Sequence, residues 1–62
     1  MSMPLTHRQW RFIHEYMIDQ NASAAAVRAG YSAKSKGAQA AELMRNERVI
    51  EQITLGLGAL FA

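Results

Sequence analysis

The sequence of 62 residues contains no cysteine, and this absence constrains the fold more than any other feature. A chain of this length buries only about 60% of its unfolded surface, so its core is small. Neither a disulfide framework nor a thiolate metal site can reinforce such a core here. The fold must therefore depend on the packing of secondary structure. We expect one small domain and not an enzyme, because an enzyme with a deep pocket needs more layers.

The residue composition favours helices. Alanine and other helix formers dominate the interior, and the single proline, Pro4, precedes the first helical pattern. This composition predicts an all-α fold, a small three- to four-helix bundle. No stretch approaches the roughly 18 apolar residues that a membrane helix needs, and the first residues lack the apolar region of a signal peptide. We therefore expect no membrane association and a cytoplasmic location.

The first helix has a clear start. Thr6 is a good N-cap, and Gln9 three residues later completes a capping box. Leu5 and Trp10 occupy the positions of a hydrophobic staple around this cap. The apolar spacing that follows predicts a helix over residues 7–19. Its apolar stripe is Phe12, Ile13, Tyr16 and Met17, and its polar side chains fall largely off that stripe: Arg8, Arg11, Glu15 and Asp19.

A short second helix is predicted over residues 22–29, with Asn21 or Ser23 as its cap. The run of three alanines from 24 to 26 allows another helix to approach closely, because these side chains are no larger than a methyl group. Gly30 stands where a glycine in the left-handed conformation ends a helix. Tyr31 then follows in a tight turn, and we expect it to pack between the first and third helices.

A third helix can begin with Ser32 or Ser35 as its cap and reach about Arg45. Gly37 is unfavourable inside a helix, so either the helix starts near it or a close backbone contact requires it. A short helix, a glycine turn and a helix with a polar start together have the layout of a helix-turn-helix. The spacing predicts one apolar side of Gly37, Ala40, Ala41 and Met44, and a polar side of Lys36, Gln39 and Glu42.

A fourth helix can begin after Asn46, with Glu47 in its first turn where a negative charge suits the helix dipole. The last eight residues are apolar, broken by glycine and uncharged. We therefore divide the chain into a domain over residues 1–54 and an apolar tail over residues 55–62. The tail is expected to begin a linker to an oligomerisation domain, which makes the chain a fragment or domain of an oligomeric protein.

The charge is unevenly distributed, although its net value is only +2. No acidic residue occurs between Asp19 and Glu42, while Arg28, Lys34 and Lys36 all fall in that interval. Such a segment can bind phosphates. Charge alone favours an ordinary solvated surface, because runs of this kind are common.

Two segments resemble a known family. Leu5 to Tyr16 fits the pattern L-T-x-K/R-Q-x-x-F-I/V-x-x-Y, and Asn21 to Ser32 fits N-A-T/S-x-A-A followed by R-A-G-Y-S. These patterns resemble the N-terminal signature of phage terminase small subunits, over about residues 5–53. The chain departs from the family at Glu47, where proline is frequent, and at Lys36-Gly37. A downstream stretch also fits: Leu43, Met44, Asn46 and Val49.

The resemblance implies a helix-turn-helix domain that binds viral double-stranded DNA at the packaging-initiation site. It also implies two partners, the terminase large subunit and further copies that form a ring, and a location in the host cell cytoplasm. In a helix-turn-helix, residues at the start of the second motif helix reach base edges in the major groove. Arg8 and Arg11 can contact the DNA backbone but lie outside the basic segment. The main DNA-binding candidates are Lys34, Ser35, Lys36, Gln39 and Arg28.

Two other interpretations stay open, a helix-turn-helix transcriptional regulator and a protein-interaction helical bundle that uses the apolar tail. We expect no cofactor and no catalytic residue, because no nucleophile and base are grouped. We also expect no metal, because His7 and His14 have no third ligand near them. The aromatic side chains are predicted to form core rather than a base-stacking surface: Trp10, Phe12, Tyr16 and Tyr31.

Overall fold

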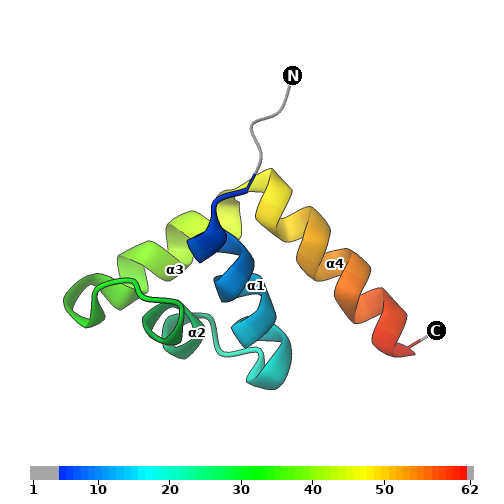
Figure 1. The fold of residues 1–62 in the computed structure, drawn as a ribbon, viewed down its shortest axis with the longest axis horizontal. Coiled ribbons are helices and arrows are strands. Elements are labelled where there is room, and N and C mark those ends of the chain that lie inside the picture. The colour runs from blue at the N-terminus through cyan, green and yellow to red at the C-terminus, as the bar shows by residue number, and fades with distance from the viewer. Residues whose placement is uncertain (1–4, 62) are drawn as a thin grey trace.

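The structure is a computed structural model that describes residues 5–61, with side chains described as far as Gly56. All regular structure in this range is helical, which confirms the predicted all-α bundle (Figure 1). None of the helices in this range is both long and apolar enough to span a membrane. The elements are α1 (His7–Asp19), α2 (Ala22–Arg28), the short 3-10 helix η1 (Ala33–Ser35), α3 (Lys36–Arg45) and α4 (Glu47–Phe61).

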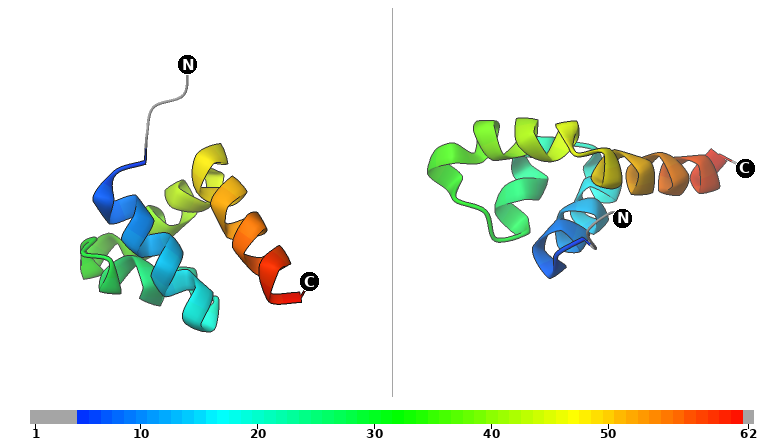
Figure 2. Two further views of the ribbon diagram at one scale, coloured as in Figure 1. Left: turned by 45° about the vertical axis from the view of Figure 1, so that its right-hand side comes forward. Right: turned by 90° about the horizontal axis from the view of Figure 1, so that it is seen from above.

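The helices are arranged around α1 and α2. Helix α1 packs against α2 and α4, and α2 packs against α3. In Figure 2 (left), α1 and α4 run side by side. In the view from above (Figure 2, right), α3 and α4 lie along one edge of the molecule, and α1 and α2 lie on the same side of that edge. One face of α3 is therefore turned away from the rest of the bundle.

Helix α1 begins and ends where the sequence predicts. The Gln9 backbone N–H donates to the Thr6 hydroxyl at 3.1 Å, and the Thr6 N–H donates to the Gln9 side-chain oxygen at 2.8 Å. This reciprocal capping box satisfies two helix-end donors. At the other end Gln20 adopts a left-handed conformation (φ +57°), and its N–H donates to the Tyr16 carbonyl at 2.7 Å. These two contacts fix the length of α1.

The turn after α2 has the hydrogen bonds of a Schellman motif. The Gly30 N–H donates to the Val27 carbonyl, and the Tyr31 N–H donates to the Ala26 carbonyl, both at 3.0 Å. Gly30 has φ +104°, a conformation that only glycine adopts at low cost. The predicted glycine turn is thus confirmed. The cap at the start of α2 is Asn21, whose side chain accepts the Ala24 N–H at 3.1 Å.

Helix α3 starts late, which confirms one of the two alternatives for Gly37. Ser32 caps η1 by accepting the Lys34 N–H at 3.3 Å, and α3 itself begins at Lys36. A Cβ added to Gly37 has nothing within 4 Å, so no internal contact requires glycine there.

The predicted apolar side of α3 is partly wrong. Ala40 and Leu43 are buried and Met44 is half-buried, but Gly37 and Ala41 are exposed. The larger apolar side chains of α3 determine which side of the helix faces the core. Glycine and alanine are too small to indicate that side. The exposed residues of α3 are therefore the small Gly37, Ala38 and Ala41 together with the longer Lys36, Glu42 and Arg45.

Helix α4 begins as predicted, because the Asn46 side chain accepts the Arg48 N–H at 2.9 Å. Helix α4 continues through Gly56 to Phe61, so the described part of the apolar tail is helical. Gly56 lies against Met17, where an added Cβ would collide with the methionine side chain. This glycine therefore permits close packing of α4 on α1. The division of the chain into two parts stays a prediction, and most side chains of residues 55–62 lie outside the described part.

The core is small, and its largest fully buried side chains are Phe12 and Val49. The aromatic predictions are confirmed for Phe12 and for Tyr16, which packs half-buried against the core. The prediction for Trp10 is wrong, because this residue is 48% exposed. The side chains of α4 that lie beside it are polar. The other buried apolar residues are Ile13, Ala25, Ala26, Ala29, Ala40, Leu43 and Ile53.

Candidate nucleic-acid interface

Three of the predicted site residues lie together at the start of α3. Lys34 and Ser35 belong to η1, and Lys36 is the first residue of α3. Both lysines are exposed, while Ser35 is half-buried and makes no capping hydrogen bond with its side chain. Neither lysine forms an ion pair within residues 5–61. The start of α3 thus presents two uncompensated positive charges to solvent.

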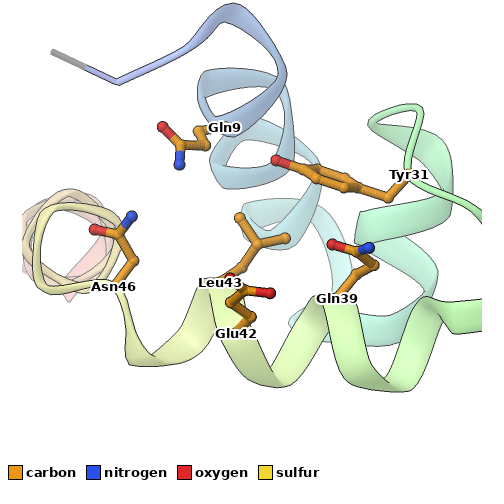
Figure 3. Close-up of a pocket in the computed structure, with 6 residues that line it drawn as sticks. All are labelled: Gln9, Tyr31, Gln39, Glu42, Leu43 and Asn46. Atoms are coloured by element: carbon orange, nitrogen blue, oxygen red, sulfur yellow. The ribbon is translucent and has the colours of Figure 1, made fainter.

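Gln39 is half-buried one turn further along α3, where it lines a polar hollow of about 160 Å³ (Figure 3). Tyr31 extends across this hollow between α1 and α3, as predicted. Burial raises the pKa of the Tyr31 hydroxyl above its ordinary value. The remaining lining residues are Gln9, Glu42, Leu43 and Asn46.

Arg28 has partners inside the protein. Its Nε donates to the Glu15 carboxylate at 2.7 Å, and its two terminal nitrogens bond to the Asp19 carboxylate at 3.1 and 3.2 Å. One of these nitrogens also donates to the Glu15 carbonyl at 3.0 Å. Four of the five guanidinium N–H groups are thus directed at α1. This geometry gives Arg28 a structural role between α1 and α2, and its predicted DNA contact stays untested.

Glu15 is buried although it falls off the apolar stripe of α1. Glu15 can be buried because two arginines pair with its carboxylate. Arg28 binds one oxygen, and the Arg11 Nε donates to the other oxygen at 2.9 Å. A carboxylate between two guanidinium groups keeps its charge where an unpaired one would not. The hydrogen bond from Arg28 is the main reason that the pKa of Glu15 is lowered, and burial opposes that shift. We name Arg11, Glu15, Asp19 and Arg28 the α1–α2 ion cluster.

The α1–α2 ion cluster should make the domain acid-sensitive. Hydrogen bonds from Arg28 lower the pKa of both Glu15 and Asp19 in the folded state. The stabilisation is therefore complete above the ordinary pKa values of these groups and is lost as the pH falls through the lowered ones. We expect the urea midpoint of unfolding to fall steeply below about pH 4.

Two variants test the origin of this acid sensitivity. Glu15→Gln should lower the midpoint at pH 7 and show a shallower loss on acidification than the parent. The control Glu51→Gln changes an exposed carboxylate of α4 and should follow the parent curve. Equal acid profiles for the two variants would contradict the assignment.

Arg8 lies at the turn between α2 and η1, although it belongs to α1. The centre of its guanidinium group is 5.4 Å from the centroid of the Tyr31 ring, and its Nε lies 3.7 Å from an ideal Cβ on Gly30. The sequence identified Arg8 as a possible backbone contact but did not connect it with this turn. No local pattern could have done so, because the two segments are brought together only by the fold.

These features define a small all-helical protein whose third helix has a basic, exposed start. The chain matches the family described as terminase small subunit over residues 5–57, which is most of its length. It belongs to that family, and this membership supports a role in phage DNA packaging. No curated protein and no solved structure matched the chain at a significant level. Among the described residues no group of histidine and acidic side chains could hold a metal ion.

Proposed function

We propose that the segment from α2 to α3 acts as a helix-turn-helix that binds viral double-stranded DNA at the packaging-initiation site. The domain acts by binding and not by catalysis, in the host cytoplasm. Through this contact it helps the terminase large subunit to start genome packaging. The observation that carries the proposal is the pair of exposed, unpaired lysines at the start of α3, Lys34 and Lys36.

The uncovered face of α3 supports this proposal. Exposed Ala38 and Ala41 lie on it beside the charged Glu42 and Arg45, and Gly37 has open space around it. Short side chains let a helix backbone approach a groove closely, and alanine can contact the methyl group of thymine. The cations of Lys34 and Lys36 can meanwhile bind phosphates at the groove edge. One such domain binds weakly, and assembly into a ring multiplies weak contacts by avidity.

The double variant Lys34→Ala, Lys36→Ala tests the proposed surface. We expect it to weaken duplex binding and to reduce the slope of log affinity against log salt by about 2, one for each lost phosphate contact. The thermal unfolding midpoint should stay nearly unchanged, because both side chains are exposed. Fluorescence anisotropy with labelled duplex DNA at several salt concentrations measures both quantities.

Single-charge variants provide the control for this test. Lys36→Ala and Arg48→Ala each remove one exposed cation, from α3 and α4 respectively. Only the first should change the salt slope. A double lysine variant that binds duplex DNA as the parent does would show that α3 is not the recognition element.

A second candidate function is favoured by exposed apolar side chains. Ile18 and Leu55 are exposed to 66% and 61%, as expected for a surface that binds another protein. A protein-interaction bundle of this kind would bind its partner with little dependence on salt, since apolar contacts do not release counterions. The same salt titration distinguishes the two functions.

A further inference from the structure

The arginines of the first two helices differ in whether their charge is neutralised. Arg11 and Arg28 both pair with Glu15, and Arg28 also pairs with Asp19. Arg8 forms no ion pair within residues 5–61 and is exposed. No pattern in the sequence separates Arg8 from Arg11. The structure separates them, because Arg11 is paired with a carboxylate and Arg8 is not.

The Tyr31 ring determines where this charge lies. A guanidinium group 5.4 Å from the centroid of an aromatic ring is within the range of a cation–π contact. A cation–π contact uses the face of the ring and none of the N–H donors of the guanidinium group. The contact therefore holds the Arg8 side chain over the turn at Gly30 without using its donors. A shallow hollow open to solvent lies at the same place, lined by Thr6, His7, Arg8, Gln9 and Tyr31.

The proposed recognition helix begins close to this point. Lys34 follows Tyr31 by three residues, so their Cα atoms lie at most about 11 Å apart. The Arg8 guanidinium group and Lys34 are therefore both near Tyr31, at the same end of the bundle. Phosphates on one DNA strand follow each other every 3.4 Å or so along the helix axis.

We propose that Arg8 is a DNA-contacting residue beside the start of α3 and binds a backbone phosphate next to those bound by Lys34 and Lys36. Tyr31 is its positioning residue. This inference rests on the proposed function and adds α1 to the DNA-binding surface. It places the phosphate contacts on two elements that the Gly30 turn holds together, so the orientation of α3 in the groove is fixed at a second point.

The matched pair Arg8→Gln and Arg11→Gln tests the inference in the full chain. Each removes one positive charge from α1 and keeps a long polar side chain. We expect Arg8→Gln to weaken duplex binding several-fold and to reduce the salt slope by about 1. Arg11→Gln should leave the salt slope unchanged, and Arg8→Lys should restore it because the charge returns.

A double-variant cycle tests the role of Tyr31. Tyr31→Leu should reduce the salt slope in the parent but not in the Arg8→Gln background, since the ring acts through Arg8. A ring that only stabilised the fold would have the same effect in both backgrounds, and that result overturns the positioning role. Circular dichroism of each variant confirms that the helices persist. Should Arg8→Gln fail to fold, the Arg8 side-chain NMR signal of the parent must shift on addition of duplex DNA.

The outcomes separate this inference from the proposed function. Parent-like binding by Arg8→Gln, with binding lost in the double lysine variant, overturns the inference and leaves α3 as the recognition element. Absence of any salt-dependent duplex binding by the parent overturns both. An unshifted Arg8 signal in a DNA-bound parent also overturns the inference.

Discussion

Replacement of Phe12 by alanine should remove a large part of the stability of the domain at room temperature. Phe12 is fully buried, and truncation of a buried phenylalanine costs about 3–5 kcal/mol because it removes apolar burial and leaves a cavity. Stabilities of roughly 0.05–0.15 kcal/mol per residue give this chain about 3–9 kcal/mol in total. The loss therefore equals much of the stability of the fold. Far-UV circular dichroism and urea titration should show reduced helix content or a far lower midpoint.

Trp10→Ala provides the matched control on the same helix. Trp10 has the larger side chain but is 48% exposed, so its truncation opens no closed cavity. We expect a loss of about 1–2 kcal/mol from the apolar surface alone, clearly less than for Phe12→Ala. If the two variants unfolded at the same urea concentration, the difference in burial between Phe12 and Trp10 would be contradicted.

Much of the fold could be predicted because its boundaries are local. The capping box of Thr6, the Asn21 and Asn46 caps and the left-handed Gly30 each depend on neighbouring residues along the chain. Local chemistry of this kind is encoded within a few positions. The predicted limits of α1 and the start of α4 therefore agree with the structure.

The errors have a common cause, which is contact between separate helices. Trp10 satisfies the helical spacing of α1, yet the side chains that α4 places beside it are polar: Arg48, Glu51 and Gln52. Glu15 falls off the apolar stripe of α1, yet it is buried where Arg28 of α2 lies against it. The end of the Met17 side chain on α1 lies where a Cβ at Gly56 would stand. Each of these facts depends on a partner in another helix.

The sequence predicts where the candidate site lies, but not which arginines contribute a free charge to it. A basic interval and a helix start together identify Lys34 and Lys36, and both are exposed as that site requires. Arg28 lies in the same basic interval, but carboxylates outside the interval neutralise it. Arg8 lies outside the interval, but the fold brings it to Tyr31. Charge along a sequence therefore differs from charge on a surface wherever ion pairs join distant segments.

Enlargement of Ala26 to leucine should be the second most damaging change. Ala26 is fully buried in α2, which packs against both α1 and α3. A leucine adds three carbon atoms where no space is left, and overpacking of this kind costs about 2–3 kcal/mol. The Ala26 carbonyl also accepts the Tyr31 N–H at the Gly30 turn, so displacement of α2 moves the start of α3 as well.

Ala41→Leu is the control for this change, because Ala41 is an exposed residue inside α3. Leucine is nearly as good a helix former as alanine, so the thermal midpoint should change little. The Ala26 variant should instead unfold about 8 °C or more below the parent, since 1 kcal/mol corresponds to roughly 4–8 °C in a domain of this size. Equal midpoints for the two variants would mean that α2 does not approach its neighbours as closely as alanine permits. The close approach of α2 would then no longer explain how the Gly30 turn holds α3 in place.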